Sequence, residues 1–316
     1  MVRAVDRSLE IIIPNWNTWD LIRRAANVLR PLSSDPNVRL TIVDNASTDP
    51  GADVTAAFPW LNIIRLPTNV GYAAANNWVL ERTHADFVLL QNSDAFPTPQ
   101  DIVTLLDQLA KRPRAAAIAP ALVTAEGRPQ VGSYGHRSSA ARWICELAGL
   151  PALPGLGESG IWGRAVIDAK ENVRSVAWVS GACLLVRMSA VRNSGLMTER
   201  YFMYMEDMDW CERFRRNGWD VLYLPSVTVT HLFAASQTST STRWIEAARL
   251  YVADHHSKAI AALLPIVGFM GFAWRAAAFF LLAVVLPSSQ KVYVKRGRRM
   301  WSLAGSCVRS ISQSVP

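Results

Sequence analysis

The chain has 316 residues and a mass of 34.9 kDa; half of its residues are hydrophobic and 18% are charged, which excludes a disordered or fibrous protein. Of its 33 basic side chains, six lie in residues 291–316, which contain no acidic residue, so that the other 290 residues hold 27 basic and 25 acidic side chains. The net charge of +8 therefore belongs mainly to the C-terminal end, and we expect no nucleic-acid partner for the main body.

The cysteine pattern and the N-terminus both indicate a cytoplasmic protein. The four cysteines are far apart and include no CxxC pair, which argues against a disulfide framework or a zinc ribbon. The first 14 residues contain no apolar run long enough for a signal peptide. We therefore expect the main body to remain in the cytoplasm.

The first 120 residues alternate short apolar runs, typical of buried strands, with segments of helical spacing. We expect strands at 9–14, 38–44, 61–66, 87–91 and 115–119, and helices at 18–32, 49–58, 72–83 and 100–111. Such alternation predicts an α/β fold in which a mostly parallel sheet carries helices on both faces. Ligands bind such sheets at the carboxyl ends of the strands.

Polar residues occupy these strand ends. Asn15 and Asn17 follow the first strand, Asp44 ends the second, and Asn92 and Asp94 follow the fourth. Asp44 is either a turn former or a contact for a nucleotide base or ribose, because its carboxylate suits both roles. Asp94 is either part of a turn or a carboxylate that holds a divalent cation beside a diphosphate.

After residue 120 the pattern changes. Residues 125–175 show no clear period and predict a long surface excursion, whose aromatic residues either close over a substrate or anchor an ordinary loop. Beyond it we expect a strand at 175–186, a helix at 206–217 and one or two strands at 221–231.

Acidic residues gather at the start of the helix expected at 206–217. Glu206, Asp207 and Asp209 either favour the helix N-terminus or repel one another, which would raise their proton affinity and suit a general base. His231, at the end of the last strand, is either a structural residue or an imidazole ligand for the cation.

Seven segments carry, in this order, a resemblance to a known family: IIIPNWN, VDNASTD, NVGYAAANN, LLQNSDAF, VSGACLLVR, FMYMEDMDWCERFRRNGW and LPSVTVTH. The set resembles the family 2 glycosyltransferases, which have the GT-A fold, and is most similar to their bacterial rhamnosyltransferase-like members. The resemblance covers residues 9 to about 235. It implies a GT-A catalytic domain at 1–240, with a nucleotide-binding half at 1–120 and an acceptor and catalytic half at 121–240.

The resemblance also implies a role for each matching position. The residues that correspond to donor-binding positions are Asn15, Asn17, Asp44, Asn69, Gly71 and Asn76. Asn92 stands at the first position of the family's Asp-x-Asp, where it would contact ribose or water with less charge than an aspartate. Asp94 would bind Mg²⁺ or Mn²⁺ together with the diphosphate, and His231 would contribute to the same metal. Asp207 would be the catalytic base, with Glu206 beside it as a substrate-binding residue.

The implied activity is that of an inverting, metal-dependent glycosyltransferase. It would move a sugar, in the first place rhamnose from dTDP-rhamnose, to a hydroxyl of a lipid-linked glycan in cell-wall or surface-polysaccharide synthesis. The alternatives are the same chemistry with a UDP- or GDP-sugar, a nucleotidyltransferase, and an inactive membrane scaffold. The segment NWNTWD after the first strand lacks the Gly-rich basic loop that a nucleotidyltransferase would place there.

The apolar excess lies in the C-terminal region, 241–316, which we expect to be helical and membrane-associated. Residues 259–286 contain one charge, Arg275, and residues 266–286 alone would form a helix of about 31 Å, enough to cross a bilayer. A crossing would put the basic end outside, against the positive-inside tendency, and would bury Arg275. We therefore favour helices that lie on or dip into the cytoplasmic face of the inner membrane over a crossing helix or a homo-oligomer interface.

Overall fold

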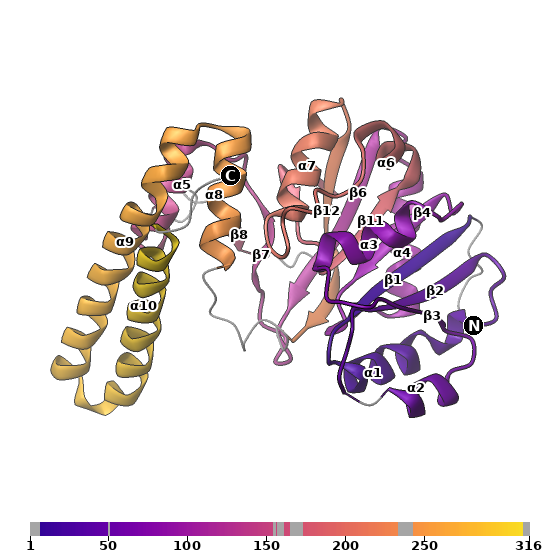
Figure 1. Ribbon diagram of the computed structural model, residues 1–316, viewed down its shortest axis with the longest axis horizontal. Helices are drawn as coiled ribbons and strands as arrows, with labels where there is room; N and C mark the ends of the chain where they lie inside the picture. The colour runs from indigo at the N-terminus through magenta and orange to yellow at the C-terminus, as the bar shows by residue number, and fades with distance from the viewer. Residues whose placement is uncertain are drawn as a thin grey trace. The chain divides into compact units, whose positions relative to one another are not determined.

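The computed structural model of the chain describes residues 7–49, 51–153, 156, 161–164, 173–232 and 243–311. The chain forms two compact units (Figure 1). The first unit comprises Met1–His136, Trp162–Phe202 and Glu206–Ala235. The second unit comprises Arg137–Ile161, Met203–Met205 and Ser236–Pro316.

In the described part of the chain, the first unit is built on a mixed sheet of nine strands. Eight of them lie in the order β3-β2-β1-β4-β11-β6-β12-β5, and β9 pairs with β12 beside this path. Their bounds are β1 (Leu9–Asn15), β2 (Val38–Asp44), β3 (Asn62–Arg65), β4 (Phe87–Gln91), β5 (Ala95–Phe96), β6 (Ala115–Val123), β9 (Arg174–Ser175), β11 (Cys183–Arg187) and β12 (Asp220–His231). The five strands expected within the first 120 residues are all present.

The direction of the strands decides where their polar ends lie. β1 is parallel to β2 and β4, and β2 is parallel to β3. β11 lies between β4 and β6 and is antiparallel to both, so β4 and β6 point the same way, and β12 is parallel to β6. The carboxyl ends of β1, β2, β4 and β12 therefore meet at one edge of the sheet.

Helices cover both faces of this sheet, as the strand–helix alternation predicts. The helices that share one hydrophobic core with it are α1 (Trp19–Leu29), α2 (Ala52–Ala57) and α4 (Pro99–Ala110). Those that pack against the sheet outside that core are α3 (Tyr72–Leu80), α6 (Met188–Ser194) and α7 (Glu206–Arg216). Because both faces are covered, the apolar residues in the middle of β1 do not alternate with polar ones. Ile11 and Ile13 belong to the core shared with α1, α2 and α4, and Ile12, on the other face of the sheet, is equally buried.

The segment expected as a surface excursion, residues 125–175, forms regular structure over much of its described part. It contains the strands β7 (Val131–Gly135) and β8 (Trp162–Arg164) and the helix α5 (Ala140–Ala148). β7 and β8 form a small sheet with β10 (Trp178–Val179), which lies just after the segment. The segment is therefore not an irregular excursion, and two of its aromatic residues anchor it, one buried and one half-buried. Trp143 is fully buried, and the Tyr134 ring lies 4.5 Å from the Tyr223 ring between centroids.

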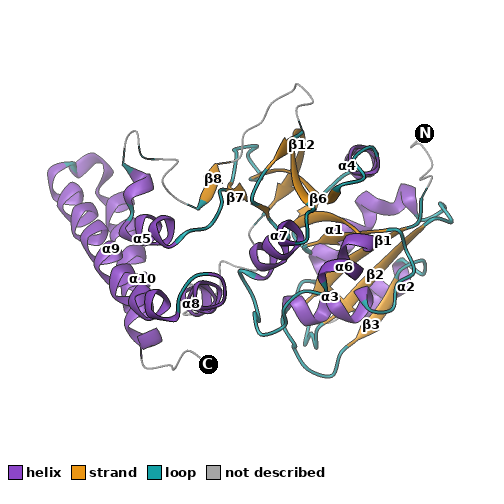
Figure 2. Ribbon diagram, turned by 90° about the horizontal axis from the view of Figure 1, so that it is seen from above, coloured by secondary structure: helices purple, strands orange, loops and turns teal. Residues whose placement is uncertain are grey.

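The described part of the second unit consists of helices and short turns (Figure 2). Its helices are α5, α8 (Arg243–His255), α9 (Lys258–Val285) and α10 (Gln290–Ile311). In the described residues, short 3₁₀ turns lie at Arg30–Leu32, Leu150–Ala152 and Pro287–Ser289. The last of these joins α9 to α10 in a hairpin. The basic end expected as a tail is thus a helix that packs along α9.

Among the described residues, α9 is the one helix long and apolar enough to cross a membrane. It does not stand alone, because small residues let its neighbours approach closely. A methyl group added at Gly271 would lie 1.9 Å from the carbonyl oxygen of Leu147 in α5, and one added at Gly268 would lie 2.9 Å from Cys307 Sγ in α10. One face of α9 is therefore fixed by protein contacts.

Candidate active site

Two predicted donor-binding residues, Asn15 and Asp44, contact each other at the ends of β1 and β2. Asn15 Nδ2 donates to Asp44 Oδ1 at 3.2 Å and to Ser47 Oγ at 3.0 Å, while Asn15 Oδ1 accepts from the Thr18 hydroxyl at 2.7 Å. Both side chains are buried. Asp44 Oδ2 lies 3.9 Å from Nε of the exposed Arg65. The pair forms a preorganised polar surface at the carboxyl edge of the sheet.

Asn17 shapes the neighbouring loop. Its backbone has a φ of 55°, in the left-handed region that asparagine tolerates better than most residues. Its side-chain oxygen accepts hydrogen bonds from the backbone N–H groups of Thr48 and Asp49 at 2.7 and 3.3 Å. Asn17 therefore holds the loop after β2 against the loop after β1, and its role towards a nucleotide stays a prediction.

Asn69 and Gly71 are joined to the same edge by Asn45. Asn45 Nδ2 donates to Asn69 Oδ1 at 2.9 Å and to the Gly71 carbonyl at 3.2 Å. Gly71 has a φ of +88°, and a methyl group added there would lie 2.5 Å from the carbonyl oxygen of Phe202. Only glycine fits this position, because both the backbone angle and the space exclude a side chain.

Asn76 is buried beside Tyr72, one helical turn further along α3. Its Nδ2 donates to the Tyr72 carbonyl of the preceding turn at 2.9 Å, whereas its Oδ1 is buried with no hydrogen-bond partner among the described residues. The Tyr72 hydroxyl donates to the Gly181 carbonyl at 2.8 Å. Burial raises the pKa of Tyr72 well above its usual value, and the carboxylates of Glu206 and Asp207 raise it further, so the hydroxyl keeps its proton.

The predicted metal residues Asp94 and His231 lie together. His231 Nε2 is 3.2 Å from Asp94 Oδ1 and 3.4 Å from Asn92 Nδ2. Asn92 and Asp94 follow β4, and His231 is the last residue of β12, at the same edge of the sheet. His231 Nδ1 lies 3.1 Å from Oε1 of Gln130, whose Nε2 donates to the His231 carbonyl. Because the amide nitrogen of Gln130 is used in this way, its oxygen faces Nδ1 and assigns the ring proton there.

The contact between His231 and Asp94 has two readings, one of which suits a cation. With a proton on Nδ1, His231 Nε2 either carries a second proton and donates to Asp94 Oδ1, 3.2 Å away, or presents a lone pair that a cation can share with that oxygen. Both side chains are buried, which strengthens the interaction. Magnesium and manganese take one or two protein ligands and complete their coordination with phosphate oxygens and water. The residues present therefore fit a divalent cation with two protein ligands.

The predicted base, Asp207, stands at the first turn of α7. Its Oδ2 accepts from the backbone N–H of Gly181 at 2.9 Å and its Oδ1 from its neighbour Met208 at 2.8 Å. Burial raises the pKa of Asp207, against the effect of these hydrogen bonds. Burial and the charge of Asp207 raise the pKa of Glu206 well above its usual range, and Glu206 Oε2 has no partner among the described residues. This pair can accept a proton more readily than exposed carboxylates.

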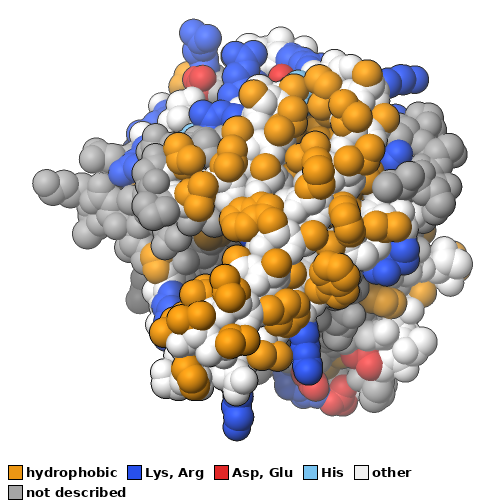
Figure 3. Space-filling model, turned by 90° about the vertical axis from the view of Figure 1, so that its left-hand side faces the viewer, with side chains coloured by type: hydrophobic (Ala, Val, Ile, Leu, Met, Phe, Trp, Pro, Cys, Tyr) orange, Lys and Arg blue, Asp and Glu red, His pale blue; other side chains and the backbone are white. Residues whose placement is uncertain are grey.

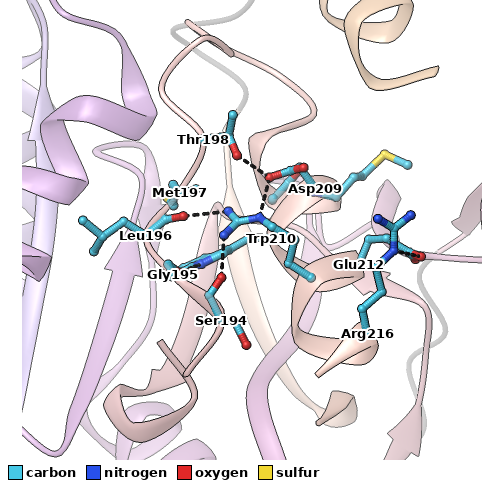
Figure 4. Close-up of polar contacts among 12 residues, drawn as sticks. Ser194, Gly195, Leu196, Met197, Thr198, Asp209, Trp210, Glu212 and Arg216 are labelled. Carbon is cyan, nitrogen blue, oxygen red and sulfur yellow. Dashed lines mark hydrogen bonds and ion pairs between the residues drawn. The ribbon is translucent and has the colours of Figure 1, made fainter. Parts of the chain in front are cut away.

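Asp209 does not belong to that pair, which corrects the expectation of three mutually repelling acids. Figure 4 shows its carboxylate directed at Thr198. Asp209 Oδ2 accepts from the Thr198 hydroxyl at 2.7 Å and from Arg213 Nε at 2.9 Å, and the same guanidinium donates to the carbonyls of Ser194 and Leu196. Asp209 therefore holds the α6–α7 connection in place.

A short turn at residues 180–182 is bonded both to Asn92 and to the predicted base. The Ala182 carbonyl accepts from the backbone N–H of Asn92 at 2.9 Å, and Gly181 bonds both Asp207 and Tyr72. Asn92, two residues before Asp94, and Asp207 are thus bonded to one three-residue segment. We did not single out this turn from the sequence, although it lies in the matching segment VSGACLLVR. The sequence offered no signal for Gln130, which sits in the segment without clear period.

The architecture defines a fold class: an α/β protein of GT-A type, with its polar strand ends gathered at one edge. A solved structure of the same fold is mannosyltransferase PcManGT from Pyrobaculum calidifontis in complex with GDP-Man and Mn²⁺. It superimposes with a TM-score of 0.56 and 15% identity, covering 97% of this chain and 87% of that one. At this identity the similarity establishes the fold alone.

The sequence comparison identifies the family within that class. The family described as Glycosyl transferase family 2 matches residues 10–145. The chain is also 31% identical over 243 residues to the N-acetylglucosaminyl-diphospho-decaprenol L-rhamnosyltransferase of Mycobacterium tuberculosis, covering 72% of this chain and 78% of that protein. A hexosyltransferase of low-salt glycan biosynthesis from Haloferax volcanii is 24% identical, covering 73% and 69%. This protein belongs to glycosyltransferase family 2 and is a rhamnosyltransferase-like glycosyltransferase.

Proposed function

We propose that this protein transfers rhamnose from dTDP-rhamnose to a hydroxyl of a lipid-linked glycan in cell-wall or surface-polysaccharide synthesis. The observation that carries the proposal is its identity of 31%, over most of both chains, to a rhamnosyltransferase whose name specifies a diphospho-decaprenol-linked N-acetylglucosamine acceptor. Family membership supports glycosyl transfer over nucleotidyl transfer and over an inactive scaffold.

The donor side of the reaction belongs to the carboxyl edge of the sheet. Asn15, Asp44 and the Asn69–Gly71 loop would bind the nucleoside, since their amides and carboxylate are already fixed by one another. Asp94 and His231 would hold Mg²⁺ or Mn²⁺. When bound, such a cation supplies positive charge to the diphosphate.

The acceptor side belongs to the start of α7. Asp207 would take the proton of the acceptor hydroxyl as its oxygen forms a bond to the anomeric carbon, while the bond from that carbon to the diphosphate breaks. Attack from the face opposite the leaving group inverts the configuration. The raised pKa of Asp207 favours this proton transfer, and the two backbone N–H groups that it accepts from fix the direction of the carboxylate.

The proposed acceptor also implies a cellular location. Nucleotide sugars are cytoplasmic and a polyprenyl-linked acceptor is in the membrane, so the protein would act at the cytoplasmic face of the inner membrane, in a peripheral or re-entrant manner. The apolar helix α9 and the basic helix α10 support this location.

The test is transfer of radiolabelled sugar to N-acetylglucosamine diphosphate carried on a short polyprenyl chain, with dTDP-rhamnose compared with UDP- and GDP-sugars. We expect a product that depends on dTDP-rhamnose and on Mn²⁺ or Mg²⁺. Asp94→Ala should abolish metal-dependent donor binding in calorimetry, whereas Asp20→Ala, at an exposed carboxylate of α1, should leave it unchanged. Transfer from a UDP- or GDP-sugar alone would contradict the proposed donor.

A further inference from the structure

Helix α9 exposes one continuous hydrophobic face. From residue 262 to residue 285, every exposed side chain of this helix is apolar. Among the largest are Leu263, Phe269 and Phe280, and the most exposed are Val284 at 75%, Leu281 at 65% and Val285 at 62%. Figure 3 shows hydrophobic side chains spread over this face, with lysine and arginine at its margins. An apolar surface of this extent on a soluble protein calls for a partner.

The opposite face of α9 is fully engaged by the second unit. Its buried residues recur at helical spacing and contact α5, α8 and α10. Arg275, the single charge in the apolar run, also turns this way: it donates to the carbonyls of Gly271 and Leu147 at 2.8 and 3.0 Å. The one charged side chain in the middle of α9 therefore turns away from the exposed face, and protein carbonyls accept its hydrogen bonds.

Helix α10 adds positive charge next to this face. Lys291, Lys295, Arg298 and Arg299 are all exposed on it, and the described part of α10 has no acidic residue. Trp301 is 59% exposed on the same helix. Basic side chains attract anionic lipid headgroups, and tryptophan favours the boundary between headgroups and acyl chains.

We propose that the α9–α10 hairpin is a monotopic anchor that lies parallel to an anionic membrane surface, with the exposed face of α9 in the acyl region and the basic face of α10 at the headgroups. Because the exposed side chains of α10 are basic, the lipid that we expect at this surface is anionic. This inference deepens the proposed function and rests on it for the lipid-linked acceptor.

The packing of α9 argues against a crossing. A helix in the bilayer core contacts lipid or other apolar helices all round, but here α5 crosses α9 at Gly271 and brings its own polar residues, Arg142 and Glu146, with it. The basic residues of α10 also lie along α9 rather than beyond its end. Moving these charges into the bilayer core is costly, whereas lying in the interface leaves them hydrated.

The test is flotation of the full-length protein with vesicles of phosphatidylethanolamine and phosphatidylglycerol, compared with phosphatidylcholine vesicles. We expect binding to the anionic vesicles and weakening by salt. Replacing Lys291, Lys295, Arg298 and Arg299 by Gln should lower the partition coefficient at least about tenfold. The matched control removes four exposed charges from the first unit, by Gln at Arg39, Lys111, Arg114 and Arg192, and should bind as the wild type does.

A second variant tests the apolar part: Leu281→Glu, Val284→Glu and Val285→Glu together should abolish flotation without unfolding, because all three side chains are exposed. Equal binding to neutral vesicles, or binding unaffected by the Gln substitutions, would overturn the proposal. A third outcome would also overturn it: no flotation of the wild type, together with a lipid-free dimer in sedimentation that the Glu variant dissociates. In that case a second copy of the chain would cover the exposed face of α9.

Topology is tested separately with Ser288→Cys in the turn between α9 and α10. This cysteine should react with a membrane-impermeant maleimide only after spheroplasts are lysed, and labelling of intact spheroplasts would show a crossing and refute the anchor. Transfer to a short, water-soluble acceptor keeps the two proposals apart. Flotation without transfer from any donor would refute the proposed function alone, and transfer without flotation would refute the anchor alone.

Discussion

Asp207→Asn separates the role of a base from the role of a structural carboxylate. The amide has the same shape as the carboxylate but cannot take a proton from an acceptor hydroxyl. It also keeps only one oxygen for the two backbone N–H groups, of Gly181 and Met208, that now donate to Asp207 at 2.9 and 2.8 Å. We therefore expect a large loss of turnover and a smaller loss of stability.

The size of each effect follows from these contacts. Loss of a positioned base typically lowers the rate about 10²–10⁴-fold, which corresponds to about 2.7–5.4 kcal/mol of activation free energy. The amide NH₂ must face either Gly181 or Met208, and one unsatisfied donor costs about 1–3 kcal/mol of unfolding free energy. Donor binding should not change, because the hydrogen bonds of the Asp207 side chain in the described structure go to Gly181 and Met208 and to none of the strand-end residues.

Asp209→Asn is the matched control, being the same substitution two residues further along α7. Its carboxylate bonds Thr198 and Arg213, so the variant should lose unfolding free energy while kcat per folded molecule is kept. The assay measures kcat for sugar transfer, donor Kd by calorimetry and Tm for both variants. A kcat of Asp207→Asn within tenfold of the wild type, or an equal loss of kcat in Asp209→Asn, would refute the assignment of the base.

Three further substitutions test other parts of the structure. Burial raises the folded-state pKa of Glu206, so the contribution of this side chain to stability is present at low pH and is lost as pH rises through that pKa. Glu206→Gln should therefore flatten the dependence of the unfolding free energy on pH, measured with urea. An unchanged dependence on pH would contradict this. Gly271→Ala, which places a methyl group 1.9 Å from the Leu147 carbonyl oxygen, should lower Tm and reduce the unfolding free energy by at least about 1–3 kcal/mol. A wild-type Tm would show that α5 and α9 can move apart to make room for the methyl group. Asn92→Asp adds a carboxylate 3.4 Å from His231 and should raise Mn²⁺ affinity in calorimetry, whereas weaker binding would argue against a cation there.

The strands of the first unit were predictable because their signals are local. β2 and β4 have the bounds expected from the sequence, since each is an apolar run that ends in a polar residue at the strand edge. The insertion of β11 between β4 and β6 was not predictable in this way. Which strand pairs with which, and in which direction, depends on contacts between residues far apart in the chain, and no residue within β11 marks its neighbours.

The site could be predicted in part for the same reason. Asp94 and His231 were recognised as strand-end residues, and the structure brings them together, but their link through Gln130 comes from a segment with no period. The separate position of Asp209 had a signal that we did not use: Arg213 lies four residues later on the same helix, the spacing of an intrahelical ion pair.

Helix α5 has a consequence for anyone who wishes to shorten this enzyme. It lies between β7 and β8 in the chain, yet it packs with the C-terminal helices: the Trp143 ring is 5.9 Å from that of Tyr251, and Trp274 donates to the Ala148 carbonyl. A truncation after β12 would strip α5 of these partners and expose an indole that is now fully covered. A more soluble enzyme is therefore better obtained by polar substitutions on the outer side of α9 than by a stop codon.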